Sequence, residues 1–485
     1  MSNEQIHAIV LKSVAASDYL QQISLHERAA LMHSIADEIA ELGESLIQTA
    51  QQETGLPNAR LQGEKGRTIG QWRSYANAIK SGLFAEARID KGDGVQKADI
   101  RKYNKAVGPV AVFGASNFPF AFSTAGGDTA SAIAAGCSVV YKEHPGHPAT
   151  SQIMAEAIQR GLRNYGAPEG VFGYIQGAEN SIGEALVLHP AIKAVAFTGS
   201  LAGGKALFNL GVSREEPIPV FAEMGSVNPV FALPEFLQQN TSTFAQQYVG
   251  SLSLGVGQFC TNPGVLVVQK DATLASFKQQ LQEEIVKIPA ARMLHQGIAN
   301  SYNQGRSQLL EQQGVEQIGA GSAAENGQGQ GAIYSVEAKY FIDNPILSHE
   351  VFGPAGLLVE CENQQQMQTV LAQLGGQLTI TFSATKGDMK QYVDLFNLAQ
   401  KKCGRLLFGG MPTGVEVVLA MQHGGPFPSS TDSRFTSVGP DAIKRFLRPV
   451  SFQNWPDELL PQELQESNPL KIERIVDNKR ELAYS

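Results

Sequence analysis

The chain has 485 residues, too many for a single hydrophobic core, so two or three domains are expected. Hydrophobic residues make up 43% of the sequence and charged residues 17%, proportions typical of a soluble globular protein and not of a disordered one. The net charge of -8, without a basic block, argues against a nucleic acid or an anionic membrane surface as the main partner.

Cysteine usage and the hydrophobic runs predict a cytoplasmic protein without a metal site. The four cysteines form no C-x-x-C pair, and no histidine cluster has the spacing of metal ligands. No stretch approaches the roughly 18–20 continuous apolar residues of a membrane span. The first residues contain neither the basic nor the apolar segment of a secretory signal.

The N-terminal part is predicted to be helical, with an exposed arm after it. From about residue 27 to residue 80, apolar residues recur at helical spacing with charges between them. Residues 88–103 consist of short polar segments with two glycines, which favours an exposed hairpin or arm.

Residues 106–223 alternate between short apolar runs and helical patterns, which predicts βαβ units and a parallel sheet. The expected strands are 107–113, 138–142, 171–175, 194–198 and 220–223, and the expected helices are 121–135, 149–160, 181–188 and 203–210. Ligands bind beyond the carboxyl ends of such strands. The polar or small residues that fall there are Asn117, Lys142, Gly199, Ser200 and Glu223.

A second α/β pattern begins near Asn228, with strands at 265–268, 356–359 and 378–382. Cys260 stands just before the first of these strands. Glu223 and Cys260 are therefore expected on either side of a domain boundary, where active sites are common.

Cys260 and Glu223 together favour covalent catalysis. A lone cysteine in an apolar stretch is usually an inert, buried hydrophobe. Here, however, the small residues around the thiol leave room for another molecule. A nearby carboxylate could take a proton from the thiol or from an attacking water, which suggests a thioester or a similar adduct.

Five short motifs occur in an order that resembles a known family. They are ASNFP at 115–119, FTGS at 197–200, EMG at 223–225, GQFC at 257–260 and HEVFGP at 349–354. This order and spacing resemble the aldehyde dehydrogenase superfamily, and the similarity runs over nearly the whole chain, to about residue 456.

The resemblance implies roles for three catalytic residues. Cys260 would attack the aldehyde carbon as a thiolate. Asn117, with the backbone N–H of Cys260, would form the oxyanion hole. Glu223 would be the general base for the water that hydrolyses the thioester. Taken alone, Asn117 would more simply be read as a helix cap and Glu223 as a solvated acid.

The resemblance also implies a nicotinamide cofactor. Gly199 and Ser200 would open a helix whose N–H groups meet the pyrophosphate, although an ordinary N-cap is the simpler reading. Glu350 would hold the nicotinamide ribose, and Phe352 would pack beside the nicotinamide; alternatively they are a surface acid and a core aromatic.

The sequence after Lys142 favours NADP, with NAD possible. Many NAD-preferring relatives carry a glutamate three residues after this lysine, and this chain has Pro145 there. The missing acid removes a repulsion against a 2′-phosphate, and His144 and His147 are expected to add donors. If the Glu143 side chain turned inward, NAD would be favoured instead.

The loop sequences favour one branch of the superfamily. Ser116 stands where many relatives have tryptophan, and the segments 411–415, 422–428 and 431–434 point the same way. They resemble the 2-oxoglutarate semialdehyde (2,5-dioxopentanoate) dehydrogenases. A fatty or other aliphatic aldehyde is the alternative substrate.

The expected architecture is α/β with three parts. A Rossmann-type cofactor domain takes residues 1–87 and 106–222, and an α/β catalytic domain takes 223–439. Residues 88–105 and 440–485 are expected to form an oligomerisation arm and tail of a homodimer or homotetramer.

Two other functions are alternatives to an aldehyde dehydrogenase. A thiol hydrolase would need a histidine beside Cys260. The next histidines along the chain, His295 and His349, offer no such partner, so this rival is disfavoured. A non-catalytic relative would be expected to have lost Cys260, Glu223 or Asn117, and all three are present.

Overall fold

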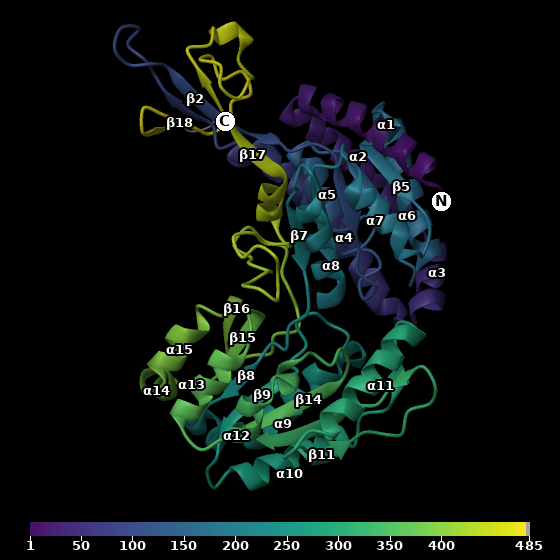
Figure 1. Ribbon diagram of the computed structural model, residues 1–485, viewed down its shortest axis with the longest axis vertical. Coiled ribbons are helices and arrows are strands. Elements are labelled where there is room, and N and C mark those ends of the chain that lie inside the picture. Colours follow the sequence, from purple (N-terminus) through teal and green to yellow (C-terminus); the bar gives the residue numbers. More distant parts are fainter. Residues whose placement is uncertain (482–485) are drawn as a thin grey trace.

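The computed structural model describes residues 1–481 and consists of two α/β lobes and a projecting arm (Figure 1). The upper lobe in Figure 1 contains the N-terminal helices and a five-stranded sheet, and the lower, green lobe contains a seven-stranded sheet. The expected α/β class with a parallel cofactor-type sheet is confirmed. None of the helices within residues 1–481 is long and apolar enough to span a bilayer.

The first sheet is fully parallel, with the strand order β5-β4-β3-β6-β7. Its strands are almost continuously apolar because helices cover both faces. They are β3 (Val110–Phe113), β4 (Val139–Lys142), β5 (Phe172–Ile175), β6 (Ala194–Thr198) and β7 (Val220–Glu223).

Two groups of helices enclose this sheet, and each group has its own hydrophobic core. One face carries α2 (Leu25–Glu41), α3 (Glu44–Thr54), α4 (Asn58–Lys80), α5 (Gly127–Ala135) and α6 (Pro148–Tyr165). The other face carries α1 (Asn3–Gln22), α7 (Asn180–Leu188) and α8 (Leu201–Ser213).

The strand order of the first sheet reverses at β3. The chain runs outward from β3 to β4 and β5, then returns to place β6 on the other side of β3. At such a switch point the loops after the two central strands diverge and leave a crevice at the carboxyl edge. The loops after β3 and β6 contain the predicted residues Asn117, Gly199 and Ser200.

The second sheet has the order β11-β13-β14-β9-β8-β15-β16, and only β11 runs antiparallel to its neighbour. The strands are β8 (Val230–Ala232), β9 (Val265–Gln269), β11 (Glu316–Ala320), β13 (Ala332–Glu337), β14 (Ala355–Cys361), β15 (Gln377–Ser383) and β16 (Cys403–Phe408). A separate small ladder joins β10 (Ala291–Arg292) and β12 (Gln328–Gly329).

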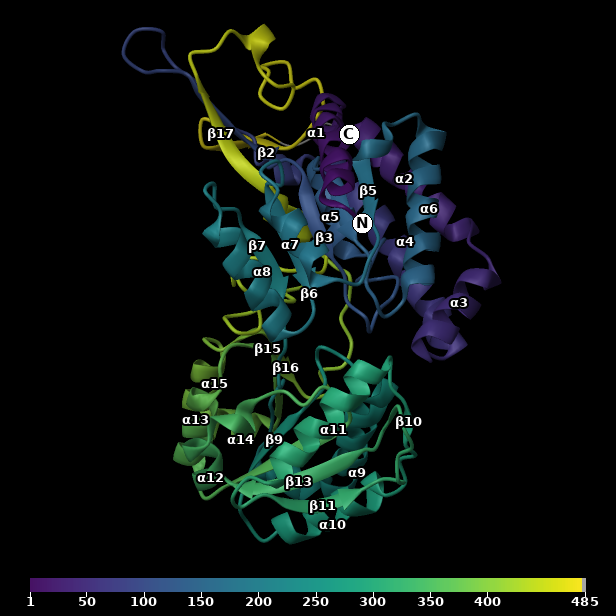
Figure 2. The ribbon, with the colours of Figure 1, turned by 45° about the vertical axis from the view of Figure 1, so that its right-hand side comes forward.

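Helices also pack on both faces of the second sheet, as Figure 2 shows from a second direction. One face carries α9 (Pro234–Ser253) and α10 (Leu274–Ile285). The other carries α11 (Gln296–Leu310), α12 (Ala338–Asp343), α13 (Gln364–Gln373), α14 (Lys386–Gln391) and α15 (Val393–Ala399).

The arm is a third sheet that projects from the upper lobe in both views (Figures 1 and 2). Its strand order is β17-β2-β1-β18-β19, so the hairpin that follows the N-terminal helices pairs with segments near the end of the chain. The strands are β1 (Arg88–Asp90), β2 (Ile100–Ala106), β17 (Leu447–Gln453), β18 (Arg474–Val476) and β19 (Lys479–Glu481).

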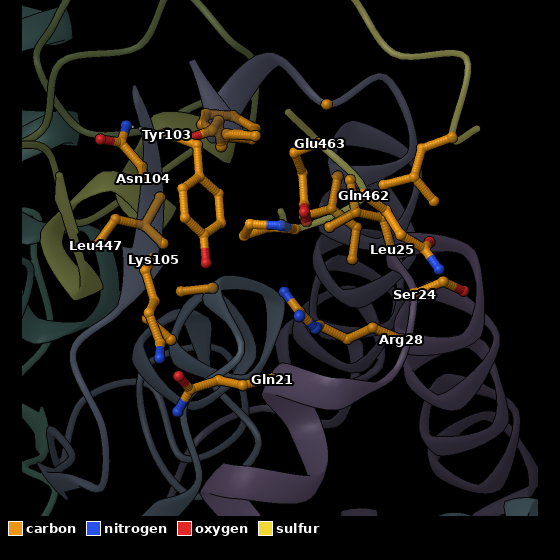
Figure 3. A pocket seen from close by; sticks show the side chains of 18 of the residues that line it. Gln21, Ser24, Leu25, Arg28, Tyr103, Asn104, Lys105, Leu447, Gln462 and Glu463 are labelled. Carbon is orange, nitrogen blue, oxygen red and sulfur yellow. Dashed lines mark hydrogen bonds between the residues drawn. The ribbon is translucent and has the colours of Figure 1, made fainter. Parts of the chain in front are cut away.

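A cavity of about 350 Å³ lies between the base of the arm and the N-terminal helices. The side chains of Arg28, Tyr103 and Glu463 point into it (Figure 3). Burial, together with the nearby Glu463 carboxylate, raises the pKa of Tyr103 to about 12. Two Arg28 nitrogens donate to the carbonyls of Leu20 and Ala134, so this arginine ties helices α1, α2 and α5 together.

The structure corrects one predicted helix. The helix expected over residues 121–135 begins only at Gly127, because residues 118–126 form turns held from outside. The Glu64 carboxylate, on α4, accepts the backbone N–H groups of Phe120 and Ala121 at 2.8 and 3.0 Å. These two bonds tie the turns ahead of α5 to α4.

Candidate active site

The nine site residues predicted from the sequence all line one cavity of about 1030 Å³ between the two lobes. The first lobe contributes the carboxyl ends of its central strands, and the second contributes the Cys260 turn and the loop before β14. The nine are Asn117, Lys142, His144, Gly199, Ser200, Glu223, Cys260, Glu350 and Phe352.

Close backbone packing positions the Cys260 turn. Asn228, which is fully buried and left-handed with φ of 46°, donates its side-chain amide to the carbonyl of Cys260 at 2.9 Å. A side chain on Gly257 would meet the backbone of Gly353 at 2.3 Å, so only glycine allows the two loops to touch. Asn262 donates to the carbonyl of the same Gly353 at 3.1 Å.

Glu223 is a buried carboxylate at the end of β7. Burial alone would raise its pKa, but the His423 imidazole, the Ser437 hydroxyl and the charge of Arg445 together lower it below the ordinary value. The Ser437 hydroxyl donates to Oε2, and Nε2 of His423 lies 2.9 Å from Oε1. Glu223 is therefore charged at neutral pH.

His423 connects this carboxylate to the thiol. Its Nε2 lies 3.4 Å from Sγ of Cys260 in hydrogen-bonding geometry, and one ligand-type atom from each of the three residues lies within 4.8 Å of the others. Its Nδ1 is buried and has no hydrogen-bond partner within residues 1–481. A proton is therefore better placed on Nε2, where it faces the Glu223 carboxylate and the sulfur.

The sequence argument against a histidine partner for Cys260 was wrong. His295 and His349 do line the cavity, but the histidine beside the sulfur is His423, far along the chain. The segment 422–428 was recognised only as a substrate-side loop. The sequence around His423 does not indicate its contact with Cys260. The two residues are 163 positions apart and meet only because the loop returns between the lobes.

The thiol itself is strongly perturbed. Burial raises the pKa of Cys260 well above its ordinary value, and the negative charges of Glu223 and Glu350 raise it further, with Arg405 opposing them. The resting residue is thus a thiol and not a thiolate. A nucleophilic role for it requires a base within reach, and Glu223 is the charged carboxylate nearby.

Asn117 is 8% exposed, and its position excludes the helix-cap reading, because α5 begins only ten residues later at Gly127. Its amide Nδ2 donates to the carbonyl of Gln258, near Cys260, at 3.1 Å. Its own carbonyl accepts from Arg60 at 2.6 Å. Asn117 is therefore fixed from both sides next to the thiol turn.

The cavity also contains a helix N-terminus that can receive an anion. Ser200 is the N-cap of α8, and its hydroxyl accepts from the N–H of Gly203 at 3.2 Å, as the simpler reading expected. The N-terminus of α8 nevertheless faces the cavity, where an anion is favoured. Across the cavity, a Cβ on Gly225 would meet Oε2 of Glu350 at 2.3 Å, so the missing side chain leaves room for that carboxylate.

At the other end of the cavity, Lys142 and His144 face the cavity but His147 does not. His147 is fully buried and lies 3.1 Å from the carbonyl of Ala115, so the expectation that it adds a donor was wrong. Burial and neighbouring cationic groups lower the pKa of His144 well below its ordinary value, so it is neutral. The Glu143 carboxylate accepts from the Tyr174 hydroxyl at 2.6 Å.

A buried thiol, a charged carboxylate and a cavity between two α/β lobes are the arrangement that the sequence resemblance implies. The profile of the Aldehyde dehydrogenase family matches residues 1–373, and the chain belongs to this family.

Two curated relatives are similar over most of their length. Alpha-ketoglutaric semialdehyde dehydrogenase 2 of Azospirillum brasilense is 49% identical over 471 residues, which cover 96% of this chain and 90% of the relative. Alpha-ketoglutaric semialdehyde dehydrogenase of Acinetobacter baylyi is 47% identical over 463 residues, covering 94% and 88%.

Solved structures share the fold at lower identity. Betaine aldehyde dehydrogenase of Staphylococcus aureus superposes with a TM-score of 0.80 at 18% identity, covering 93% of this chain and 88% of the other. Glyceraldehyde-3-phosphate dehydrogenase GapN of Methanocaldococcus jannaschii, solved with NADP, gives 0.79 at 17% identity, covering 93% and 94%.

The raised pKa of Cys260 predicts slow alkylation at neutral pH. Only the thiolate reacts with iodoacetamide. At pH values below the pKa of Cys260 in the folded protein, the alkylation rate of this residue should therefore increase about tenfold per pH unit. We expect no plateau between about pH 7 and pH 9 in the protein without cofactor. Mass spectrometry of the Cys260 peptide measures the rate, and the buried Cys137 is an internal control. A plateau below pH 8 would contradict the prediction.

Proposed function

We propose that this protein oxidises 2-oxoglutarate semialdehyde (2,5-dioxopentanoate) to 2-oxoglutarate with NAD(P). The observation that carries the proposal is the similarity to two α-ketoglutaric semialdehyde dehydrogenases, at 49% and 47% identity over nearly all of this chain. The branch motifs at 115–119 and 422–428 support the same substrate. The runner-up is a fatty or other aliphatic aldehyde.

In the proposed reaction, Cys260 attacks the aldehyde carbon and forms the C–S bond of a thiohemiacetal. The thiol proton passes to Glu223, which is charged at neutral pH and so has a free site for it. The Nε2–H of His423 stabilises the thiolate as it forms. Asn117 and the backbone N–H of Cys260 donate to the oxygen on which negative charge develops.

When NAD(P) binds, the N-terminus of α8 would hold the pyrophosphate, Glu350 the nicotinamide ribose and Lys142 the adenosine ribose, and Phe352 would pack beside the nicotinamide. The bound cofactor supplies the acceptor for the hydride that leaves the adduct. After Glu223 has released the thiol proton to solvent, it deprotonates a water that attacks the Cys260 thioester. The C–S bond breaks, the acid departs and the thiol is restored.

We infer that the three parts of the chain have the functions that the sequence predicts for them. Residues 1–87 and 106–222 bind the cofactor, residues 223–439 carry the nucleophile, and the arm with the tail mediates a homodimer or homotetramer. Large hydrophobic side chains exposed on the arm are available for contact with a second copy of the chain and support the last point. They are Ile100, Trp455 and Ile475.

The test of the proposed function is a comparison of substrates. The wild type should convert the semialdehyde with a kcat/KM roughly 10²-fold above that for pentanal, which lacks both the keto group and the carboxylate. Growth of the reduced-nicotinamide absorbance measures the rate, and Cys260→Ala should abolish it. A preference for pentanal would instead support the aliphatic-aldehyde alternative.

Glu223→Gln should slow hydrolysis more than acylation. We expect a burst of reduced cofactor of about one equivalent per site, followed by turnover slower by roughly 10²-fold or more, because the water loses its base. Rapid-mixing absorbance separates the two phases. If the burst rate and the steady-state rate decline equally, Glu223 serves only to deprotonate the thiol or only supports the structure.

We further propose a preference for NADP. Lys142 faces the cavity, the acid that would repel a 2′-phosphate is replaced by Pro145, and the Glu143 carboxylate is engaged by Tyr174. The neutral His144 offers a weaker contact than a charged histidine would. Taken together, these residues favour the 2′-phosphate of NADP over the free 2′-hydroxyl of NAD.

Pro145→Glu should lower kcat/KM for NADP by roughly tenfold or more, because a carboxylate approaches the 2′-phosphate. Pro145→Gln is the matched control, since it frees the same backbone without adding charge. Parallel kinetics with NAD and NADP measure both. Equal losses in the two variants would assign the effect to loop shape, and a wild type that prefers NAD about tenfold would overturn the proposed preference.

A further inference from the structure

Helix α4 carries an unusual polar stripe on its inward face. Arg60, Glu64, Arg67 and Gln71 recur at helical spacing, and each is fully or partly buried. An amphipathic helix normally buries apolar residues on such a face, so buried charges there need an explanation.

The first two members of the stripe hold the Asn117 segment. Arg60 donates to the carbonyl of Asn117, and its guanidinium packs between the rings of Phe118 and Phe259, 4.8 and 4.7 Å from their centroids. Glu64 accepts from the following turn, as described above. These two residues therefore have a positioning role, which leaves Arg67 unexplained.

Arg67 has an open hydrogen-bonding edge. Its Nη1 donates to the carbonyl of Val415, but Nε and Nη2 are buried and have no partner within residues 1–481. The N–H bonds of Nε and Nη2 point in parallel, which is the edge that binds a carboxylate with two hydrogen bonds. No carboxylate of the described chain lies within 4.0 Å of it, although Glu64 and Glu416 are near enough to affect its pKa.

Arg405 repeats this arrangement from the second lobe. Its Nη1 and Nη2 donate to the carbonyls of Gly414 and Pro412, both at 2.9 Å, while Nε is buried without a partner. The two arginines thus hold neighbouring residues of one loop, 412–415, from opposite lobes. Each side chain is partly exposed, while its unpaired nitrogens are buried.

Both arginines lie near Cys260 but outside the wall of the cofactor cavity. Arg67 packs over the Phe122 ring at 5.6 Å, and Phe122 in turn lies 6.4 Å from the ring of His423, which contacts the thiol. Burial lowers the pKa of both guanidinium groups, and interaction with Cys260 partly opposes this. Arg67 therefore lies on the Phe122 and His423 side of the sulfur, and Arg405 is close enough to interact with it.

We propose that Arg67 and Arg405 bind the carboxylate of the substrate, at the end remote from the aldehyde, and select aldehydes that carry such a group. This inference rests on the proposed function, and it adds the residues that distinguish a semialdehyde from an uncharged aldehyde. The unpaired N–H groups gain partners only when a substrate oxyanion arrives.

The experiment compares 5-oxopentanoate with pentanal, which differ only by a carboxylate in place of a methyl group, in the intact protein with saturating cofactor. The measured quantity is the ratio of kcat/KM for the two aldehydes. Arg67→Met should lower this ratio roughly 10- to 100-fold, mainly through KM for the acid, and Arg67→Lys should restore part of it. Arg405→Lys should also lower the ratio, because lysine lacks the planar guanidinium group with its fixed N–H directions.

Arg73→Gln is the matched control. Arg73 lies on the same helix but on its outer face, where it pairs with Asp37 at 2.8 Å, so the ratio should not change. A loss in Arg67→Met that is equal for both aldehydes would assign Arg67 a purely structural role and overturn the inference.

The wild type separates this inference from the proposed function. A wild type that prefers 5-oxopentanoate to pentanal but does not oxidise 2-oxoglutarate semialdehyde would refute the proposed substrate and leave the arginine pair standing. A wild type that oxidises the semialdehyde, with an unchanged ratio in Arg67→Met, would refute only the arginine pair. No preference for the carboxylate in the wild type would overturn both.

Discussion

The site depends on keeping one buried carboxylate charged. Glu223 ends a strand of the first lobe, yet its partners His423 and Ser437 come from the segment that returns from the second lobe. That segment also pairs with β7 directly: Met224 donates to the carbonyl of Ser429 at 2.8 Å. An unpaired charge at this depth would neutralise itself by taking a proton. The network that preserves the base therefore also joins the lobes.

Glycines set the geometry of the other half of the site, because three loops meet at backbone distance. Gly257 touches Gly353, and Gly225 leaves space for the carboxylate of Glu350. A methyl group on Gly257 would push apart the Cys260 turn and the loop before β14, and one on Gly225 would displace the Glu350 side chain. The thiol and the cofactor-facing loop are thus one packed unit, and their relative position does not rely on long side chains.

The strand ends were predictable because their signals are local. The apolar runs at 194–198 and 220–223 coincide with β6 and β7, and the polar residues after them line the cavity. Helix α1 gave a weak pattern, since its buried face includes Ser13 and Ser17. His423 and the α4 stripe were not predictable, because hydropathy assigns isolated polar residues to solvent and their partners lie far away in sequence.

Charge links the recognition of an anionic substrate to the ionisation of Cys260. Burial and the negative charges of Glu223 and Glu350 raise the pKa of the thiol and keep it protonated. A substrate with its own carboxylate would add a third negative charge near the sulfur and make the thiolate still harder to form. In the proposed arrangement, the positive charges of Arg67 and Arg405 offset the negative charge of the substrate carboxylate. In this arrangement, recognition of an anionic aldehyde and ionisation of the nucleophile no longer oppose each other, which an apolar entrance would not achieve.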